Sequence, residues 1–243
     1  LKELPEKLEN IIYSKLEGEQ KKLYIANALR LKSDIEGKSQ KEFQSGKLQI
    51  LSEITRLRQI CCDPSLCYDN YKDSSGKLET CMELVHNGIE AGHKMLLFSQ
   101  FTSMLSIIEK RLIEDGISYF VLTGATPKKE RFEMAEKFNN DDTSVFLISL
   151  KAGGIGLNLT GADFVIHYDP WWNLAVQNQA TDRAHRIGQK KKVAVFKLIT
   201  KNTIEENILK LQENKNQLAN QVISDELGSF TALTKDELME VLL

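Results

Sequence analysis

Two arginines are the residues of this chain best suited to polyphosphate chemistry. Arg183 and Arg186 are three residues apart, so on a helix both would project from one face. A guanidinium group binds phosphate oxygens through a planar fork of N–H donors, and a pair aimed at one polyphosphate would use that geometry. A surface salt bridge with Asp182 or with a neighbouring helix is the alternative. From these residues alone, both interpretations stay open.

A glycine-rich turn precedes the arginines, but it matches no complete phosphate-binding motif. Its glycines, Gly153, Gly154, Gly156 and Gly161, do not have the G-x-G-x-x-G spacing. The whole chain also lacks a Walker A sequence, G-x-x-x-x-G-K-[ST], and an acidic D-E-x-H box that would hold Mg²⁺. The chain by itself therefore has no means to cradle the β and γ phosphates of a nucleotide.

The elements that must position these residues alternate between apolar strands and amphipathic helices from residue 77 onward. Such alternation predicts parallel strands with right-handed crossovers, and uninterrupted apolar runs such as 145–148 suit strands covered on both faces. We therefore predict an α/β fold with an open parallel sheet and helices on both faces. The predicted strands are 95–98, 119–122, 145–148, 164–168 and 193–198, and the predicted helices are 79–91, 102–114, 128–138 and 175–186.

Polar and small residues follow each predicted strand. In a doubly wound sheet, functional groups gather at the carboxyl ends of the strands, where phosphates can approach main-chain N–H groups. Ordinary turn chemistry is the alternative for any one of these loops. The residues are Ser99 and Gln100, then Gly124 and Thr126, then Ser149, Lys151 and Ala152, and finally Asp169, which would cap the following helix or orient an arginine.

The two ends of the chain have helical patterns of a different kind. Residues 16–60 predict two helices, with apolar stripes at Leu23, Ala26 and Leu29 and at Leu48, Leu51, Ile54 and Leu57, separated by a loop over 33–39. A long polar helix is predicted over 203–223 and a short one over 235–242, capped by Thr234 and Glu237. The expected parts are an N-terminal segment with a helical protrusion (1–60), a connector (61–76), the α/β lobe (77–200) and C-terminal helices (201–243).

Composition excludes several classes of protein. The net charge of −2 argues against a polybasic nucleic-acid binder, so the Lys190-Lys191-Lys192 run is interpreted as a solvated loop rather than a binding site. Four cysteines without C-x-x-C pairs, and His167 and His185 without ligand partners, predict no metal site. No apolar run reaches the ~20 residues that span a bilayer. We expect a soluble intracellular protein without disulfides.

Three strings of residues closely resemble the Swi/Snf family of helicase-like, DNA-translocating ATPases. They are KAGGIGLNLT (151–160), DPWWN (169–173) and QATDRAHRIGQ (179–189). The likeness extends over nearly the whole chain, through QKKLY (20–24), LRQICCDPSL (57–66), KMLLFSQ (94–100), VLTGAT (121–126) and the helix at 203–218. Within DPWWN, Trp171 and Trp172 are either a stacking platform for bases or packing anchors, and packing is the favoured interpretation.

The resemblance implies the second RecA-like lobe of a two-lobed motor, with a helical protrusion and C-terminal brace helices. The first lobe would precede Leu1 in the same polypeptide and hold most of the Mg²⁺ contacts, with ATP between the lobes. Matched by position, Arg186 is the arginine finger and Arg183 its companion, while Gln179, Gly156 and Asn158 lie near the nucleotide. By the same matching, one strand of a DNA duplex is contacted by Ser99, Gln100, Gly124, Thr126, Ser149, Lys151 and Ala152.

The activity implied is that of a double-stranded DNA translocase that remodels protein–DNA complexes, located at the nucleoid of a prokaryote or in a nucleus. The isolated lobe is expected to be a monomer without ATP turnover. A strand-separating helicase of superfamily two shares the fold and the arginine pair. A non-catalytic module that docks a partner, with structural arginines, is the alternative from another class.

Overall fold

The computed structural model describes residues 4–150, 152, 156–218 and 234–242, and the chain divides into two compact units. The first unit comprises Leu1–Ile12, Leu78–Trp171 and Ala175–Leu198. The second comprises Tyr13–Lys77, Trp172–Leu174 and Ile199–Leu243. No helix in the described part of the chain is both long and apolar enough to cross a membrane.

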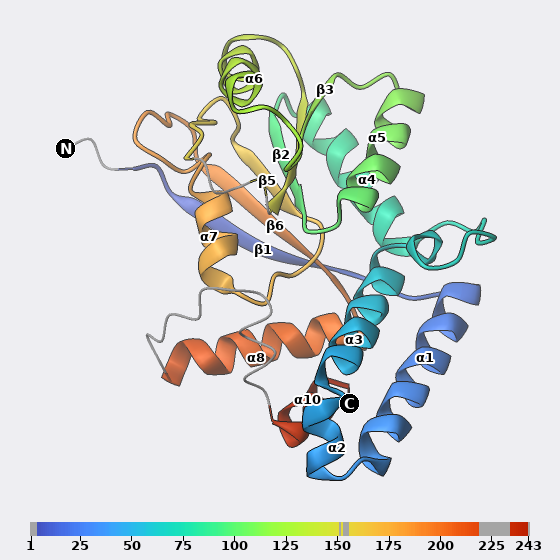
Figure 1. The fold of residues 1–243 in the computed structure, drawn as a ribbon. Coiled ribbons are helices and arrows are strands. Elements are labelled where there is room, and N and C mark those ends of the chain that lie inside the picture. The colour runs from blue at the N-terminus through green and yellow to red at the C-terminus, as the bar shows by residue number, and fades with distance from the viewer. Residues whose placement is uncertain (1–3, 151, 153–155, 219–233, 243) are drawn as a thin grey trace. The chain divides into compact units, whose positions relative to one another are not determined.

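A six-stranded parallel sheet organises the first unit (Figure 1), which confirms the predicted open α/β fold. All five predicted strands are present within one or two residues of their expected ends. The strands lie in the order β1-β6-β5-β2-β4-β3, so β2 pairs with both β4 and β5 at the centre. Their bounds are β1 (Lys7–Ser14), β2 (Met95–Ser99), β3 (Tyr119–Leu122), β4 (Val145–Ser149), β5 (Phe164–His167) and β6 (Val193–Thr200).

The edge strand β1 was not expected from the sequence. Its residues, KLENIIYS, mix polar and apolar side chains without strict alternation, so local pattern does not identify a strand. The backbone N–H of Val193 donates to the carbonyl of Glu6 at 3.1 Å, and that of Lys201 donates to the carbonyl of Ser14 at 2.9 Å. Both bonds join residues nearly 190 positions apart, so β6 supplies the partner that makes this segment extended.

Helices cover both faces of the sheet (Figure 1). On one face lie α4 (Gly76–Glu90) and α5 (Thr102–Glu114), and on the other lie α6 (Lys128–Asn140) and α7 (Leu174–Thr181). Alternate residues of β2 serve the two faces: Leu96 and Phe98 belong to the cluster beneath α6 and α7, whereas Met95 lies against α4. The continuous apolar strands are therefore explained by burial on both sides.

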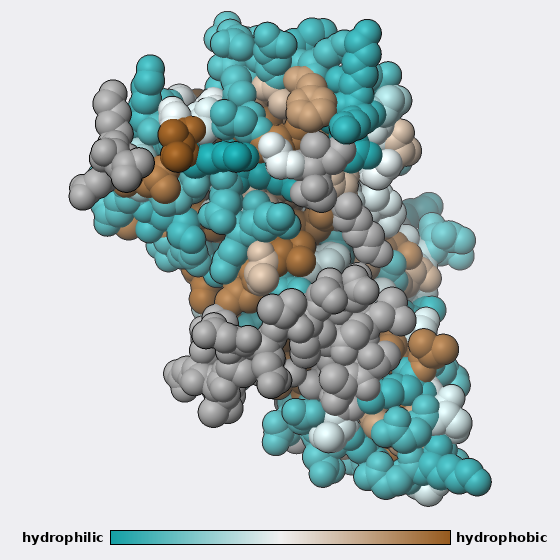
Figure 2. Space-filling view, turned by 60° about the vertical axis from the view of Figure 1, so that its left-hand side comes forward, coloured by the Kyte–Doolittle hydropathy of each residue, from teal (hydrophilic) through white to brown (hydrophobic). Residues whose placement is uncertain are grey.

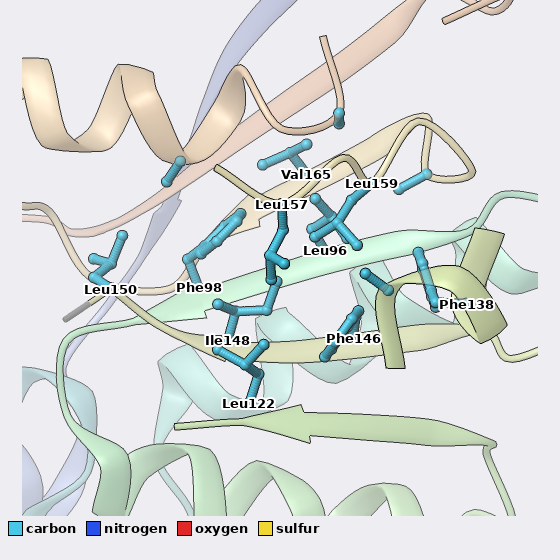
Figure 3. Packing of buried hydrophobic residues seen from close by; sticks show 14 of the residues in the cluster. Leu96, Phe98, Leu122, Phe138, Phe146, Ile148, Leu150, Leu157, Leu159 and Val165 are labelled. Atoms are coloured by element: carbon cyan, nitrogen blue, oxygen red, sulfur yellow. The ribbon is translucent and has the colours of Figure 1, made fainter. Parts of the chain in front are cut away.

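The core beneath α6 and α7 also anchors the glycine-rich segment. Figure 3 shows Leu157 and Leu159 pointing into this cluster with Leu96, Phe98 and Ile148. Both leucines are almost completely buried, while Gly156 and Asn158 beside them are exposed. The alternation fixes the segment to the sheet through its leucines and presents the intervening residues to solvent.

The second unit is helical. Its elements are α1 (Gly18–Gly37), α2 (Gln40–Ser45), α3 (Lys47–Cys62), the 3₁₀ helix η1 (Pro64–Leu66), α8 (Ile204–Leu218) and α10 (Lys235–Leu242). The C-terminal capping box is confirmed, because the N–H of Glu237 donates to the Thr234 hydroxyl and the N–H of Thr234 to the Glu237 carboxylate. The last five residues of the predicted helix 203–223 lie outside the described residues.

Two predictions about this unit are wrong. The loop expected over 33–39 is mostly helix, because α1 continues to Gly37 and buries Leu31 and Ile35 in the core of the unit. Packing of these two side chains outweighs the loop propensity of Ser33 and Asp34 between them. Leu29 and Leu48, part of the predicted apolar stripes, are exposed at 62% and 70%.

Candidate functional site

One pocket of about 400 Å³ in the first unit brings together most of the residues predicted to lie near a nucleotide. Its lining includes Gly156, Gln179, Arg183 and Arg186, which come from the glycine-rich segment, from α7 and from the turn after α7. Asn158 does not line it. The other lining residues are Leu4, Leu157, Asp182, His185 and Ile187.

The arginines do not lie on a helix, which corrects the prediction of a helix over 175–186. Helix α7 ends at Thr181, and residues 182–188 form turns and bends. The carbonyl of Arg183 accepts a hydrogen bond from the N–H of Leu159 at 3.0 Å, and the carbonyl of Ala184 accepts one from Nε2 of Gln189 at 3.0 Å. The N–H groups of Arg183 and Ala184 bond to carbonyls three residues earlier rather than four, at 3.4 and 3.0 Å, so the α-helix does not continue here.

The two arginines have different environments. Arg183 is 4% exposed, and its burial lowers the pKa of the guanidinium to about 10. Arg186 is exposed, and among the described residues its side chain has no hydrogen bond or ion pair. The predicted alternative of a salt bridge with Asp182 is therefore not observed for Arg186 in that part of the chain. Arg186 is the arginine that is available to a ligand.

Gly156 lies directly beside Arg186. A Cβ atom added at Gly156 would be 3.8 Å from Nη1 of Arg186, so the missing side chain leaves the backbone of this residue open toward the guanidinium. Backbone N–H groups and a guanidinium are both donors to phosphate oxygens. Gly156, Arg186 and Gln179 therefore bring groups that can donate to phosphate oxygens to one pocket.

Gln189 fixes the turn that carries the arginines. Its Nε2 lies within hydrogen-bond distance of the carbonyls of Thr160, Ala162 and Ala184, at 3.2, 2.7 and 3.0 Å. Its Oε1 accepts from the N–H groups of Lys190 and Lys191. Gln189 therefore ties the glycine-rich segment to the arginine turn. The QATDRAHRIGQ string contains it, but only the structure shows this role.

The residues predicted to contact DNA lie at the carboxyl ends of β2, β3 and β4, and several of them are buried. Ser99 is completely buried, and its Oγ donates to Oδ1 of Asp169 at 2.6 Å. The N–H of Gln100 lies 3.3 Å from the same oxygen. Asp169, which was expected to cap a helix or orient an arginine, accepts both bonds and thereby holds the end of β2. Ser149 and Ala152 are also buried.

The loop after β3 is the accessible part of this predicted DNA side. Gly124 is exposed and Thr126 is half-buried. Arg131 of α6, which the sequence did not single out, donates to the carbonyls of Gly124, Thr126 and Ala152. Lys151, the one cation predicted at this side, lies outside the described residues. The DNA contacts of all these residues stay predictions.

The tryptophans, the lysine run and the cysteines, which were also candidates from the sequence, take part in packing and ion pairs or are free thiols. Trp171 is in the core of the first unit and Trp172 in that of the second, which agrees with packing rather than an open stacking platform. Lys191 and Lys192 form ion pairs with Asp163 and Glu6 at 3.0 and 2.8 Å. All four cysteines are free thiols, and the described residues contain no cluster of three His, Cys, Asp or Glu side chains suited to a metal.

Known proteins resemble the chain in sequence and in structure. A model of the helicase conserved C-terminal domain matches residues 76–188. An ATP-dependent helicase of Mycoplasma pneumoniae, itself uncharacterised, is 42% identical over 243 residues, which cover 99% of the chain and 23% of the helicase. The chain spans about a quarter of the length of this helicase and of two further bacterial relatives.

Two solved structures from Sulfolobus solfataricus have the same fold. The C-terminal domain of a SWI2/SNF2 ATPase superposes with a TM-score of 0.78 at 34% identity, covering 97% of this chain and 98% of that domain. A SWI2/SNF2 ATPase core in complex with double-stranded DNA superposes with a TM-score of 0.81 at 35% identity, over 98% of this chain and 50% of that core. The correspondence includes nearly every residue of the chain.

Proposed function

Since the chain belongs to the SWI2/SNF2 family of ATPases, as their helicase C-terminal domain, we propose that it is the second motor lobe of an ATP-dependent double-stranded DNA translocase. Such a motor would remodel protein–DNA complexes. The observation that carries this proposal is the pocket that joins Gly156, Gln179, Arg183 and Arg186. Residues from three separate segments converge there on a set of donors suited to a polyphosphate.

The proposed ligand of this pocket is ATP with Mg²⁺. Hydrolysis of the terminal phosphoanhydride bond of ATP would supply the free energy for movement. The exposed Arg186 would bind the phosphates from this lobe as an arginine finger, offsetting negative charge on the transferred phosphoryl group. Gly156 and Gln179 would contact the nucleotide beside it, and the buried Arg183 would hold the wall behind Arg186. The Walker A sequence is absent from the chain, so the first lobe would supply the β-phosphate and most Mg²⁺ contacts.

Double-stranded DNA is the proposed ligand of the second set of residues, at the carboxyl ends of β2, β3 and β4. Gly124 and Thr126 in the loop after β3, with Lys151 and Ala152 after β4, would follow one strand of the duplex. Ser99, Gln100 and Ser149 belong to the same edge of the sheet, and their buried side chains would shape its backbone. Closure and opening of the cleft between the two lobes would then move this edge along the DNA.

ATP turnover by the full-length protein tests the proposal. The rate is measured without nucleic acid, with single-stranded DNA and with duplex DNA, for the wild type and for Arg186→Ala. We expect stimulation by duplex DNA and a loss of about 10³-fold in the stimulated rate of Arg186→Ala, with ATP still bound. Arg30→Ala, which removes another exposed arginine, from an ion pair with Glu53, is the matched control and should keep wild-type turnover.

Other outcomes select the alternatives. Stimulation by single strands but not by duplex would indicate a strand-separating helicase. Absence of turnover in the wild type would indicate a non-catalytic module that docks a partner. Unchanged turnover in Arg186→Ala would remove this residue from the proposed finger role while leaving the family assignment intact.

A further inference from the structure

Arg131 connects two loops of the proposed DNA side. Its Nε donates to the carbonyl of Thr126 at 2.7 Å, its Nη2 to that of Gly124 at 2.9 Å and its Nη1 to that of Ala152 at 3.4 Å. Among the described residues it has no carboxylate partner. The rigid guanidinium fork thus binds only main-chain oxygens, from the loop after β3 and the segment after β4, and sets the distance between them.

Asn139 makes the corresponding contacts at the other end of the same helix. Its Nδ2 donates to the carbonyl of Asn158 at 2.9 Å, and its Oδ1 accepts from the N–H of Gly161 at 2.9 Å. A Cβ atom added at Gly161 would lie 2.9 Å from Cα of Asn139, so only glycine permits this approach. Asn139 therefore holds the part of the glycine-rich segment that leads out of the nucleotide pocket.

The helix between these two residues is seated firmly on the core. Arg131 and Asn139 are eight residues apart in α6, a rise of about 12 Å. Between them Ala135 and Phe138 are buried, and the ring of Phe138 lies 5.2 Å from that of Phe146. A buried aromatic side chain in close-packed surroundings resists displacement, so the two ends of α6 keep a fixed separation.

We infer that α6 is a strut that couples the proposed nucleotide pocket to the proposed DNA side, with Arg131 and Asn139 as its positioning residues. A shift of the segment at Asn158 and Gly161 is transmitted by Asn139 through α6 and by Arg131 to the carbonyls of Gly124, Thr126 and Ala152. The inference rests on the proposed function. Neither residue contacts a ligand in this scheme, and each acts through backbone groups that it holds.

A double-mutant cycle in the full-length ATPase tests the strut. The rate of ATP turnover is measured without DNA and with saturating duplex DNA for the wild type, Arg131→Lys, Asn139→Ala and the double variant. Arg131→Lys keeps the charge but loses the fork that spans three carbonyls. We expect each single variant to lower the ratio of stimulated to unstimulated turnover by roughly tenfold, and the double variant to lower it no further, because either break disconnects the two sites.

Two neighbouring residues provide matched controls. Lys129→Ala removes a cation from the same helix at a side chain that is 90% exposed. Asn140→Ala removes an amide that, among the described residues, donates to the carbonyl of Glu136 in its own helix and to no other group. Both should keep the wild-type ratio. If Asn139→Ala does not fold, Asn139→Asp replaces it, because it retains the acceptor for Gly161 and loses only the donor to Asn158.

The outcomes separate the strut from the function on which it rests. Effects that multiply in the double variant, or unstimulated rates that fall in proportion to the stimulated ones, overturn the strut and leave the translocase proposal standing. Wild-type protein that duplex DNA does not stimulate overturns both. A melting temperature close to that of the wild type, together with a lowered ratio, is the result that a merely structural role of these residues does not produce.

Discussion

The two predicted sets of functional residues differ in how the fold treats their side chains. Around the nucleotide pocket, Gly156, Asn158, Gln179 and Arg186 are exposed and only Arg183 is buried. On the predicted DNA side the proportions are reversed. There Ser99, Gln100, Ser149 and Ala152 are buried, Thr126 is half-buried and Gly124 is exposed.

This difference indicates a division between residues that act on a ligand and residues that shape the surface presented to it. An exposed side chain such as Arg186 meets a ligand directly, and its removal costs activity without much loss of folding free energy. A buried polar side chain such as Ser99 satisfies an internal hydrogen bond, so its removal costs stability first. Residue type and spacing alone do not distinguish the two kinds.

The largest expected change in the free energy of unfolding separates the two arginines of the pocket. Arg183→Ala removes a long buried side chain and should lower the free energy of unfolding by about 3–4 kcal/mol. Arg186→Ala removes an exposed one and should change it by less than about 0.5 kcal/mol. Chemical denaturation of both variants measures the contrast. Arg183→Met retains most of the buried volume and should lose less than Arg183→Ala; equal losses in both alanine variants would erase the distinction between the two arginines.

The next effect concerns the buried end of β2. Asp169→Ala leaves the hydroxyl of Ser99 and the N–H of Gln100 buried without this acceptor, and we expect a loss of about 2–3 kcal/mol in the free energy of unfolding. Asp169→Asn keeps an acceptor oxygen and should lose less. Denaturant titration is again the measurement. Weaker DNA binding by Asp169→Ala at undiminished stability would show that this end of the sheet acts directly on DNA. That result would contradict the view that its buried residues only shape the surface.

The third prediction concerns His167, a buried side chain two residues before Asp169, and the pH dependence of the free energy of unfolding. Burial, and secondarily Lys197, lowers the pKa of His167 to about 3, from an ordinary value near 6.5. Between those values the unfolded chain binds more protons than the folded one, so stability falls as pH falls from about 6.5 toward 3. The contribution of His167 to this slope is expected to be about 1.4 kcal/mol per pH unit.

His167→Gln provides the control for that titration, because it removes the ionisable group and should flatten this part of the pH profile. The measurement is the free energy of unfolding at several pH values between 4 and 6. An unchanged slope in the variant would assign the acid sensitivity to other groups and would mean that His167 reaches solvent.

The smallest effect is predicted for Lys151, known here from the sequence alone. In the full-length protein, Lys151→Ala should weaken duplex DNA binding several-fold and reduce the slope of log K against log salt by about 0.9, as expected for one lost phosphate contact. Binding is measured between about 50 and 200 mM salt. Lys129→Ala, on an exposed helix surface, is the charge-matched control. An unchanged slope would mean that Lys151, the one cation predicted on the DNA side, does not contact a phosphate.

Local pattern predicted the elements whose residues are apolar at regular spacing. The five strands between Met95 and Thr200 and the helix α5 were identified from sequence because both faces of the sheet are buried and the helix is amphipathic. The pattern also singled out the two arginines as candidates for phosphate binding, since guanidinium chemistry is a property of the residue itself, and that role stays a prediction.

Contacts between distant residues decided what the pattern did not. The strand state of β1 depends on β6, the turn after α7 is held by Leu159 and Gln189, and the continuation of α1 depends on the burial of Leu31 and Ile35. None of these partners is adjacent in sequence, so local propensity contains no information about them.

The sequence by itself therefore determined the family, the α/β class with its five strands from β2 to β6, and the residue types available for phosphate and DNA binding. Only the tertiary structure decided which of those side chains reach solvent, and that Arg131, Asn139 and Gln189 hold the loops between them. The physical reason is that burial and long-range hydrogen bonds depend on which distant segments pack against each other, and local sequence does not specify those pairs. Exposure of Arg186 and burial of Ser99 follow from how those segments pack.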